Sequence, residues 1–513
     1  MKKYALITVS DKTGVERLAV ELEKLGYGIL STSGTARYLR GFCSAVTEVS
    51  DLTGFPEILD GRVKTLHPVI HAGILADRDN EAHLGTLREM KIQRIDLVAA
   101  NLYPFEQTRL RPNATPEEII ENIDIGGPTL IRAAAKNHRG VIVLTDPADY
   151  EEVLGYLRDG LEVPETTRRH LAAKAFALVS AYDAGIADYL SEPDGAAANQ
   201  LPPSVSIGCC LDSALRYGEN PHQKAGFYRS AQTGWKVLHG KELSFNNLQD
   251  IDSSLRALRL FERPTAVITK HCNPCGIGSS ESLQDAYAKA FAADTQSPFG
   301  GIVALNRPLD LATAERINQV FTEIIIAPGY ESGVLDFLKK KKNRRLIEFD
   351  PVVALVAESP WELKNLLRGY LLQEWDLVDE HPAAWKVVSQ RQPDQREAKA
   401  LRFAWKVVSL LRSNAIAITG EDCVYGLGSG QTSRIDSTHL AIWKAHKFGH
   451  DISSAVCASD GFFPYRDSVD ELHQNGIKAI IQPGGSKADE DVVRACDEYG
   501  MALVFTGFRH FRH

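Results

Sequence analysis

Lys270-His271-Cys272-Asn273-Pro274-Cys275-Gly276 follows the β-branched run Thr265-Ala-Val-Ile-Thr269, and this stretch decides both the fold class and the candidate chemistry. The apolar run predicts a buried strand that ends in a Pro/Gly turn. In open α/β sheets, ligands bind at the carboxyl ends of the strands. We therefore expect Lys270 and His271 to lie side by side at such an edge, where an amine and an imidazole can transfer protons. A surface lysine beside a hydrogen-bonded turn histidine is the alternative interpretation.

The composition is typical of a globular protein with several domains. The 513 residues are too many for one hydrophobic core, so two or three domains are expected. The net charge of -8 argues against nucleic acid as a partner, because general binding needs a basic surface. The eight cysteines are scattered, which favours a reducing, cytoplasmic location. No apolar run reaches membrane-spanning length, and the start lacks a signal-peptide pattern, so no membrane partner is expected.

Strands and helices alternate through the first part of the chain. Apolar runs at 4–9, 26–30, 95–100 and 141–145 predict strands, and helical spacing is found at 15–25 and over 147–190. This alternation predicts a parallel sheet with helices on both faces. Residues 191–206 are rich in small and helix-breaking types and are interpreted as a linker, so domains are expected at 1–190 and 207–513.

Polar turns follow the predicted strands. Ser10–Gly14 and Ser31–Thr35 each lead from a strand into a helix, and they expose backbone N–H groups and hydroxyls at the helix start. Two such turns at one sheet edge favour a phosphate site, although simple helix capping uses the same residue types. Gly61–Pro68 adds two cations and a histidine, and Asn101–Phe105 and Asp124–Thr129 supply further polar loops.

The second part of the chain carries several polar clusters. Leu215–Gln223 combines a cation, an aromatic ring and amides, and Val424–Arg434 predicts a glycine-rich turn after a helix at Arg402–Ser413. Thr506–His513 carries two Arg and two His directly after a predicted strand, which can tie this segment into a sheet. Lys339–Lys342 is interpreted as a solvated helix end.

Three common site types are disfavoured. Cys272-x-x-Cys275 suggests zinc, but no second ligand pair exists, and the His-x-Glu element of zinc deaminases is missing from the sequence. The Gly426-x-Gly428 pattern fails the dinucleotide fingerprint because Gln431 stands at the third glycine position. No serine lies in a G-x-S-x-G elbow.

A set of short motifs resembles one family from end to end. The motifs are SDKTG (10–14), GRVKTLHP (61–68), NLYPF (101–105), DIGG (124–127), RAAAKNH (132–138), LRYGENPHQ (215–223), KHCNPCG (270–276), FGGIVALN (299–306), SNA (413–415), GSGQTSR (428–434), FFP (462–464), QPGG (482–485) and RHFRH (509–513). Each motif is weak alone, but their order along the whole chain is specific. The chain is similar to the bifunctional purine biosynthesis proteins, which join an AICAR transformylase to an IMP cyclohydrolase.

The resemblance implies an α/β protein with two catalytic parts. The N-terminal domain would be a parallel-sheet domain like methylglyoxal synthase, and the C-terminal transformylase would contain two cytidine-deaminase-like α/β subdomains without zinc. A homodimer would place the transformylase sites at the subunit interface. Formyl transfer from 10-formyltetrahydrofolate, a reduced folate co-substrate, would convert AICAR to FAICAR. Loss of water from FAICAR would then give IMP, with no catalytic metal.

The resemblance also implies residue roles. For formyl transfer, His271 would be the base and Lys270 would stabilise the transition state, and the pocket would be completed by Arg216, Tyr217, Gly300, Glu323, Asn414, Arg434, Phe462 and Arg509. For ring closure, Lys136 would donate and accept the proton, supported by Tyr103, Asp124 and Lys64. The matching nucleotide-binding positions are Ser10, Asp11, Lys12, Ser33, Gly34, Thr35, Arg62, Lys64, Thr65, Asn101 and Ile125.

Three positions depart from the family pattern. Ser33 stands where a glycine is usual, Pro298 where a small residue is usual, and Gly461 where an alanine is usual. None is a presumed proton-transfer group, so altered affinity is expected rather than lost activity. The alternatives are a nucleotide-binding regulatory protein, which has no need of Lys270, His271 and Lys136, and a zinc deaminase, which lacks its ligands here.

Overall fold

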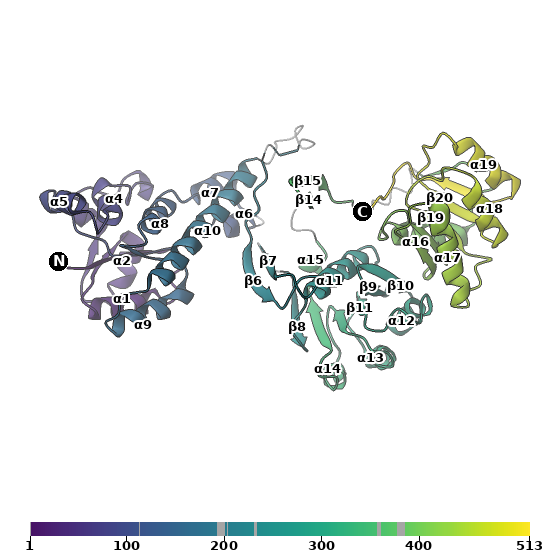
Figure 1. Ribbon diagram of the computed structural model, residues 1–513, viewed down its shortest axis with the longest axis horizontal. Coiled ribbons are helices and arrows are strands. Elements are labelled where there is room, and N and C mark those ends of the chain that lie inside the picture. Colours follow the sequence, from purple (N-terminus) through teal and green to yellow (C-terminus); the bar gives the residue numbers. More distant parts are fainter. Residues whose placement is uncertain are drawn as a thin grey trace. The chain divides into compact units, whose positions relative to one another are not determined.

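The computed structural model describes residues 2–111, 113–191, 201–202, 204–229, 233–356, 361–376 and 385–513. The chain forms two compact units, Met1–Cys209 and Cys210–His513, each of which is described by itself (Figure 1). Most of the predicted linker at 191–206 lies outside the described residues. Within the part that the structure describes, no helix is both long enough and apolar enough to cross a membrane.

The first unit is built on a five-stranded sheet in which every strand is parallel to its neighbours. Its strand order is β3-β2-β1-β4-β5. The strands are β1 (Tyr4–Thr8), β2 (Gly28–Ser31), β3 (Val46–Glu48), β4 (Leu97–Ala100) and β5 (Ile142–Leu144). The predicted parallel α/β sheet is therefore confirmed, and β3, a three-residue edge strand with no fully buried position, is an addition that the sequence pattern did not indicate.

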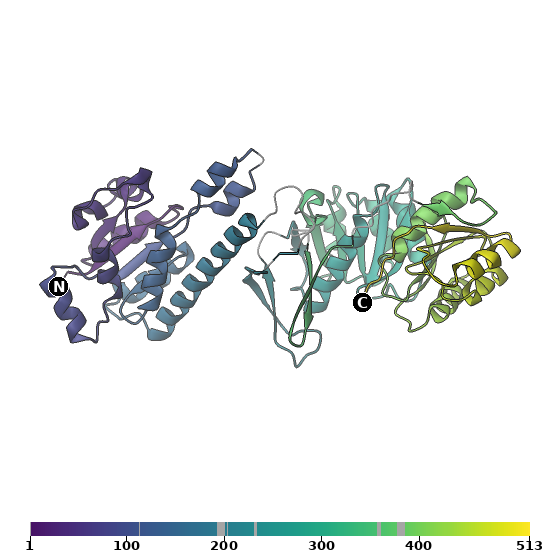
Figure 2. The same cartoon turned by 90° about the horizontal axis from the view of Figure 1, so that it is seen from above.

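Helices cover both faces of this sheet, so β1, β2 and β4 are apolar and buried throughout their central residues. The helices are α1 (Val15–Lys24), α2 (Ser33–Leu39), α3 (Val49–Thr53), α4 (Pro68–Leu75), α5 (Glu81–Glu89), α6 (Phe105–Arg109), α7 (Pro116–Glu121), α8 (Gly126–Lys136), α9 (Tyr150–Arg158) and α10 (Glu165–Leu190). Helix α1 packs on β2 and α9, whereas α8 packs on β4 and β5 and is covered by α4 and α10. The long blue helix in Figure 2 is α10.

The prediction of a continuous helix over 147–190 is wrong. The structure divides this segment into a short 3-10 turn, α9 and α10, with a break between Arg158 and Glu165. Pro164 stands directly before α10, where its missing N–H is tolerated, but it cannot lie inside a helix without removing a hydrogen bond.

The second unit contains two six-stranded sheets and two separate hairpins. The strands are β6 (Cys210–Leu215), β7 (Ala225–Arg229), β8 (Trp235–His239), β9 (Thr265–Lys270), β10 (Asn273–Ser279), β11 (Ile302–Leu305), β12 (Ile324–Ala327), β13 (Arg345–Phe349), β14 (Trp361–Leu366), β15 (Gly369–Glu374), β16 (Lys386–Val387), β17 (Ile416–Thr419), β18 (Val424–Gly428), β19 (Val456–Ser459), β20 (Ala479–Gln482) and β21 (Ala502–Phe505). The helices are α11 (Phe245–Leu258), α12 (Leu283–Ala292), α13 (Leu311–Asn318), α14 (Val334–Leu338), α15 (Pro351–Ala354), α16 (Gln395–Val408), α17 (Arg434–Lys447), α18 (Asp467–Gln474) and α19 (Asp489–Glu498).

The two large sheets repeat one topology. Their orders are β10-β9-β11-β12-β13-β8 and β18-β17-β19-β20-β21-β16, and corresponding strands have the same relative directions. We call the part built on the first sheet (235–349) the first subdomain and the part built on the second (386–505) the second subdomain. Helices α11 and α16 lie in one shared core with residues of both sheets, including Val267 of β9 and Ala417 of β17, and Trp405 of α16 is buried in this core. The prediction of two α/β subdomains is thus confirmed.

Two predicted turns of the second unit are strands. Pro274–Gly276 belongs to β10, which pairs with β9 through a two-residue turn at His271 and Cys272. Val424–Gly428 is β18 rather than part of a glycine-rich turn. The glycines serve close packing, because a Cβ at Gly276 or Gly426 would stand 2.0 Å from a backbone oxygen of α12 or α17, respectively.

Two helices of the second unit, α11 and α16, start directly after a capping residue. Helix α16 begins at Gln395, which is earlier than the helix predicted at Arg402–Ser413. Ser244 and Asp394 each form a capping box with the residue three positions later, which fixes the first turn well before the apolar spacing becomes clear.

Candidate functional site

The first unit has a pocket of about 840 Å³ at the carboxyl edge of its sheet. Strand β1 is the switch point, because the chain continues to β2 on one side and β4 pairs on the other. Of the residues expected from the sequence, the pocket is lined by Ser10, Lys12, Gly34, Thr35, Arg62, Lys64, Thr65, Asn101, Tyr103, Asp124 and Ile125. Asp11 and Ser33 neighbour the lining residues in the chain but do not line the pocket.

Side-chain hydrogen bonds hold the turn after β1. The Oδ1 atom of Asn101 accepts from the backbone nitrogens of Ser10 (2.5 Å) and Asp11 (3.2 Å), and its Nδ2 donates to the Asp11 carbonyl (2.8 Å). Thr35 ties the start of α2 to the end of β1, since its hydroxyl donates to the Val9 carbonyl at 3.0 Å. Asp11 accepts from the Thr13 hydroxyl, and this bond lowers the pKa of Asp11. The cavity walls are therefore fixed before any ligand binds.

Ser33 takes an ordinary helical position. It is the first residue of α2 and is not among the described residues with positive φ, so the backbone there is unstrained. Its hydroxyl donates to Glu57. Replacing the usual glycine therefore adds a polar contact at the pocket edge without distorting the turn.

Lys64, Tyr103 and Asp124, the residues expected to support proton transfer, all line this pocket. The Lys64 ammonium lies 3.1 Å from the Tyr103 hydroxyl. Asp124 Oδ1 accepts from the Gly127 backbone nitrogen at 2.8 Å, at the start of α8. Burial raises the pKa of Asp124, and the hydrogen bond from Gly127 and the charge of Lys64 oppose this rise. A carboxyl with a raised pKa keeps its proton more readily, so it can take part in proton transfer.

Asp124→Asn is expected to reduce the loss of stability of the first unit as the pH rises. A raised folded-state pKa means that stability from Asp124 is full below the unfolded pKa and is lost as the pH rises through the folded pKa. We would measure the free energy of unfolding by urea, followed by circular dichroism, between about pH 4 and pH 8. This free energy should fall less with rising pH in the variant than in the unaltered protein. Asp79→Asn, at an exposed position, is the control, and equal decreases in all three proteins would contradict this prediction.

Lys136 lies at the other end of α8. Gly126 and Gly127 line the pocket at the start of this helix, whereas Lys136 is its last residue and is exposed. A helix rises about 1.5 Å per residue, so the Lys136 Cα lies about 15 Å along the axis from that of Gly126. Helix α8 connects two parallel strands and must end at the opposite edge of the sheet, so one chain does not bring Lys136 to its own pocket.

Sequence patterns did not indicate two contributors to this pocket. Glu121 lines it and pairs with Arg62, although it belongs to α7, whose acidic sequence is typical of an exposed helix. Tyr182 of α10 donates to the Asn122 carbonyl (2.9 Å) and accepts from the Asp124 nitrogen (2.8 Å), which fixes the Asp124 loop from a distant helix.

In the second unit, Lys270 ends β9 as predicted. This end of β9 lies at the amino edge of the parallel strands, whereas a carboxyl edge was expected. Because β9 is antiparallel to β11, its carboxyl end meets the amino ends of β11, β12 and β13. Lys270 donates to the Phe299 carbonyl at 2.8 Å. Glu323 lies on this edge between Asn247 (3.3 Å) and Arg345 (2.8 Å), and Gly300 stands just before β11. The structure therefore brings Lys270, Gly300 and Glu323 to one edge.

His271 occupies an unusual backbone conformation. His271 and Cys272 have φ of 53° and 59°, the left-handed region that favours glycine. The Cys272 nitrogen donates to Asp250 at 2.6 Å, which fixes the turn to α11. Non-glycine residues held in this region cost of order 1 kcal/mol each, and such strain concentrates at functional sites. The exposed imidazole is thus presented on a defined two-residue turn.

A second cluster surrounds Arg434 in the second subdomain. Its guanidinium donates to the Asn414 side chain (2.8 Å) and pairs with Asp460, whose side chain is fully buried. Asp460 also accepts from the Ala415 nitrogen at 3.1 Å and from the Ser413 hydroxyl. One buried carboxylate therefore orients both Asn414 and Arg434.

The last residues of the chain join this cluster, as the strand before them suggested. The His510 nitrogen donates to the Asp460 carbonyl at 3.0 Å. The Arg509 guanidinium lies 4.5 Å from the centre of the Phe511 ring. Phe462 lies two residues after Asp460 in the chain, and its side chain is partly exposed. A Cβ at Gly461 would stand 2.6 Å from both Arg434 and Phe511, so the glycine found here permits their close approach.

Asp460→Asn is expected to destabilise the second unit by about 3 kcal/mol, because it leaves the buried Arg434 without its counter-charge. All six tryptophans lie in this unit, so tryptophan fluorescence during urea unfolding reports it alone. Asp470→Asn removes a partly exposed partner of Arg466 and should cost less than about 1 kcal/mol. Equal costs for the two variants would contradict the central role of Asp460.

Arg216 and Tyr217 are the remaining predicted residues of the second unit. Arg216 and Tyr217 follow β6, with the guanidinium 5.7 Å from the ring centre. Burial raises the pKa of the Cys272 thiol, and the positive charge of Arg412 acts in the opposite direction. The hydrogen bonds and contacts described above do not join Arg216 or Tyr217 to either cluster.

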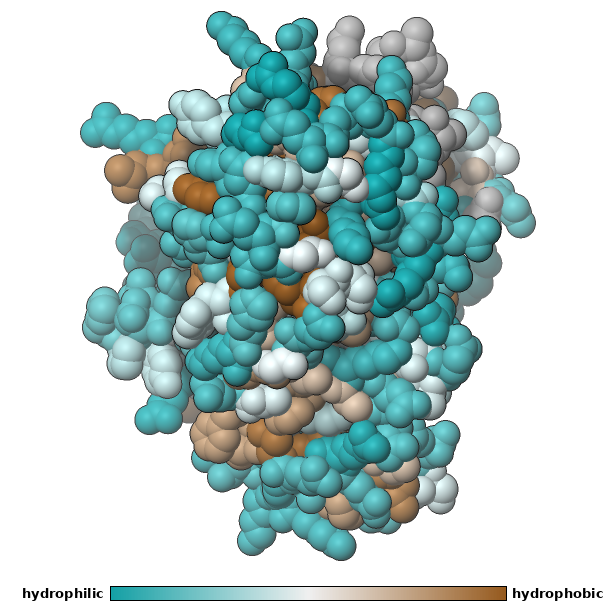
Figure 3. Space-filling model, turned by 90° about the vertical axis from the view of Figure 1, so that its right-hand side faces the viewer, coloured by the Kyte–Doolittle hydropathy of each residue, from teal (hydrophilic) through white to brown (hydrophobic). Residues whose placement is uncertain are grey.

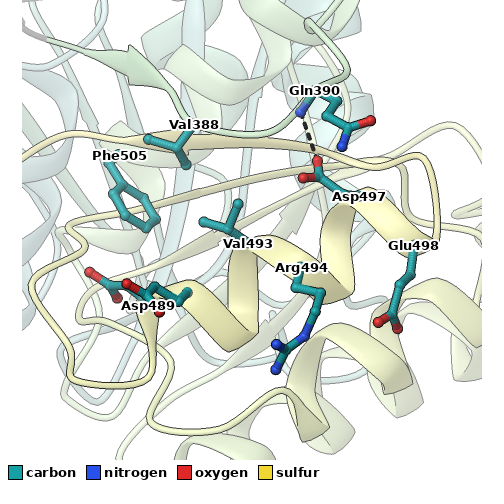
Figure 4. Close-up of a pocket in the computed structure, with 9 residues that line it drawn as sticks. Val388, Gln390, Asp489, Val493, Arg494, Asp497, Glu498 and Phe505 are labelled. Atoms are coloured by element: carbon teal, nitrogen blue, oxygen red, sulfur yellow. Dashed lines mark hydrogen bonds between the residues drawn. The ribbon is translucent and has the colours of Figure 1, made fainter.

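A separate groove of about 650 Å³ lies beside α19 (Figure 4). Val388, Val493 and Phe505 form its apolar floor, and Asp497 accepts from the Gln390 nitrogen at 2.7 Å. It contains none of the predicted site residues. The face at the α18 and α19 end is mostly hydrophilic, with hydrophobic residues in small separate patches (Figure 3).

Among the described residues, no group of three or more His, Cys, Asp and Glu side chains is arranged to hold a metal ion. Cys272 and Cys275 are free thiols, and burial raises the pKa of both.

A cation-lined pocket on a parallel sheet, joined to a duplicated α/β unit with paired lysine and histidine, defines a two-site α/β enzyme. The chain belongs to the AICARFT/IMPCHase bienzyme family, whose sequence model matches residues 134–444, and an MGS-like domain matches residues 14–129. The predicted methylglyoxal-synthase-like character of the N-terminal domain is thus confirmed.

Full-length relatives support this assignment. The bifunctional purine biosynthesis protein PurH of Streptococcus pyogenes serotype M3 is 48% identical over 521 aligned positions, which cover 100% of both chains. The protein of the same name from serotype M4 is 47% identical with the same coverage. A solved structure titled "Crystal structure of ForH" is 41% identical, with a TM-score of 0.34, and covers 37% of this chain and 100% of its own.

Proposed function

We propose that this protein is a bifunctional enzyme of purine biosynthesis that converts AICAR to IMP in two steps. Formyl transfer from 10-formyltetrahydrofolate gives FAICAR, and loss of water closes the second ring. The observation that carries the proposal is full-length identity of 48% to PurH, with Lys270-His271 presented on a strained turn. We assign cyclisation to residues 1–190 and formyl transfer to residues 207–513.

In the formyl transfer step, His271 acts as the base. The amino group of AICAR is a poor nucleophile because its lone pair is delocalised, so its proton must leave as the new C–N bond forms. The Lys270 ammonium stabilises the oxyanion of the tetrahedral adduct. The bond from the formyl carbon to folate N10 then breaks, N10 takes a proton, and tetrahydrofolate leaves.

Nucleotide recognition uses the clusters around Lys270 and Arg434. Asn414 and Arg434 are held by Asp460, and Gly300 and Glu323 lie on the edge beside Lys270. We place Arg216, Tyr217, Phe462 and Arg509 in the same site. We also propose a homodimer in which two copies of the chain complete each site.

In the cyclisation step, the carboxamide nitrogen of FAICAR attacks the formyl carbon, and water leaves. Asp124, with its raised pKa, accepts and returns a proton, while Lys64 and Tyr103 stabilise the oxyanion. Lys12 and Arg62 supply positive charge for the phosphate. Because Lys136 lies at the far end of α8, its participation in the chemistry requires a second copy of the chain to supply it.

The scheme relies on protein acids and bases, with reduced folate as the co-substrate and a cytoplasmic setting. An absorbance assay with AICAR and 10-formyltetrahydrofolate tests it by following tetrahydrofolate release and IMP formation together. Both products are expected. Neither product from folded protein that binds AICAR would replace the proposal with a nucleotide-binding regulatory protein.

A further inference from the structure

The proposed formyl transfer depends on where the Lys270 ammonium stands. This ammonium donates to the Phe299 carbonyl at 2.8 Å. Within the part of the chain that the structure describes, that carbonyl is its one hydrogen-bond partner. A lysine carries its charge on a flexible four-carbon stem, so the ammonium is placed by the group that holds its end. The segment that carries Phe299 therefore decides where the positive charge lies.

Phe299 belongs to residues 294–301, which lie between α12 and β11 and which we call the 294–301 turn. The side chain of Asp294 anchors the first half of this turn. Its Oδ1 accepts from the backbone nitrogens of Gln296 (3.0 Å) and Ser297 (2.8 Å), and its Oδ2 accepts from the Ser297 hydroxyl (2.6 Å). Asp294 is only 3% exposed. Three hydrogen bonds to one buried carboxylate hold this half of the turn in place.

Backbone hydrogen bonds fix the second half of the turn. The Gly300 nitrogen donates to the Phe321 carbonyl at 2.7 Å, and the Gly301 nitrogen donates to the Pro298 carbonyl at 2.9 Å. A Cβ at Gly301 would stand 2.9 Å from a backbone oxygen of β9, so the turn lies directly against the end of that strand. The Phe299 carbonyl lies between the two fixed halves, and its position depends on both.

The second subdomain contacts the same carboxylate. The Lys444 ammonium of α17 lies 3.8 Å from Asp294 Oδ2. His450, which follows α17, forms a hydrogen bond of 2.8 Å with the carbonyl of Ala292, the last residue of α12. Asp294 therefore stands where the two subdomains meet, and Lys444 balances part of its buried charge.

We propose that Asp294 is a positioning residue for formyl transfer, which sets the place of the Lys270 ammonium through the 294–301 turn. This inference rests on the proposed role of Lys270. The Asp294 carboxylate is buried and already accepts three hydrogen bonds, so it acts on the reaction through the turn and not by contact with substrate. A donor stabilises an oxyanion only when it is held at the right distance, so a displaced ammonium lowers kcat more than it weakens substrate binding.

Asp294→Ala removes all three hydrogen bonds and should lower kcat for formyl transfer by about a hundredfold, the effect of moving a reacting group by about 1 Å. The KM for AICAR should stay within about threefold, because other groups bind the nucleotide. Asp294→Asn keeps an oxygen that accepts from the two backbone nitrogens, and it should recover most of the lost kcat. Cyclisation of supplied FAICAR should be unchanged in both variants.

Asp310→Ala is the matched control. Asp310 Oδ1 accepts from the Thr313 nitrogen and its Oδ2 accepts from the Thr313 hydroxyl, both at 2.7 Å. This aspartate lies in the same subdomain but follows β11, at the other edge of the sheet from Lys270. Its loss should leave kcat within about twofold. Urea unfolding followed by tryptophan fluorescence compares the stability of the variants. Equal losses of kcat in Asp294→Ala and Asp310→Ala would overturn the proposal.

A double-mutant cycle tests the route through Lys270. Single-turnover rates of formyl transfer, with enzyme in excess, are measured for Lys270→Met, Asp294→Ala and the double variant. Because the ammonium is already absent from Lys270→Met, adding Asp294→Ala should lower its rate by less than about twofold. A further loss of about a hundredfold would overturn the proposal, since the two residues would then act independently. Absence of formyl transfer in the unaltered protein would contradict the proposed function, whereas unchanged kcat in Asp294→Ala of an active protein would overturn the positioning role alone.

Discussion

His271→Ala should lose formyl transfer by about a thousandfold while cyclisation of supplied FAICAR is unchanged. A positioned general base contributes about 10²–10⁴ to rate, and no other described histidine lies on the turn that follows Lys270. The imidazole is exposed on a turn fixed by Asp250, so its removal leaves no cavity and should not unfold the protein. Separate assays of tetrahydrofolate release and of IMP formation from FAICAR measure the two effects.

Two further variants separate the imidazole from its backbone. His271→Asn keeps a residue that tolerates the left-handed conformation at φ 53°, yet it cannot accept the proton. It should be as inactive in formyl transfer as the alanine variant. Cys272→Ala truncates the neighbouring turn residue, which has the same backbone conformation, and should keep most activity. An active His271→Asn would exclude His271 as the base.

Lys64→Met should lose cyclisation by about a hundredfold, with FAICAR accumulating from AICAR. The Lys64 ammonium lies 3.1 Å from the Tyr103 hydroxyl inside the pocket, where it stabilises developing negative charge. Lys136→Met makes the same change of length and charge at the far end of α8, about 15 Å along the helix axis from Gly126, which lines the pocket. The geometry of one chain predicts a much smaller loss for Lys136→Met, measured as IMP formation from FAICAR.

The comparison also decides where Lys136 acts. An equal loss in Lys136→Met would contradict cyclisation by one chain alone. Mixing the two variants would then restore activity, because a mixed dimer would contain one pocket with Lys64 and Lys136 both intact. Equal losses without restoration would mean that the Lys136 end of α8 acts on the pocket from within its own chain.

Local patterns were sufficient to predict the parallel sheet of the first unit. The apolar runs at β1, β2, β4 and β5 are short, buried on both faces and separated by helices, which leaves a parallel sheet as the simple solution. Once the sheet is parallel, the loops after β1, β2 and β4 must meet at one edge. Most of the pocket could therefore be predicted, whereas Glu121 and Tyr182 reach it through tertiary packing that no local pattern encodes.

The second unit shows where local patterns fail. Pro274 and Gly276 favour a turn by composition, but Gly276 is needed where α12 crosses β10, and the turn falls on His271 and Cys272 instead. The position of Lys270 at a strand end was correct. The kind of edge was not, because the direction of β9 relative to β11 depends on a hairpin that the sequence did not indicate. The expected roles of the site residues stay predictions.

The most direct test of two separate sites is a mixing experiment with His271→Ala and Lys64→Met. Each variant alone should form almost no IMP from AICAR and 10-formyltetrahydrofolate, because one step is blocked in each. The mixture should form IMP, since FAICAR released by the Lys64→Met protein can be closed in the intact pocket of the His271→Ala protein. A mixture as inactive as its components, with each protein folded and active in its remaining step, would contradict two independent sites.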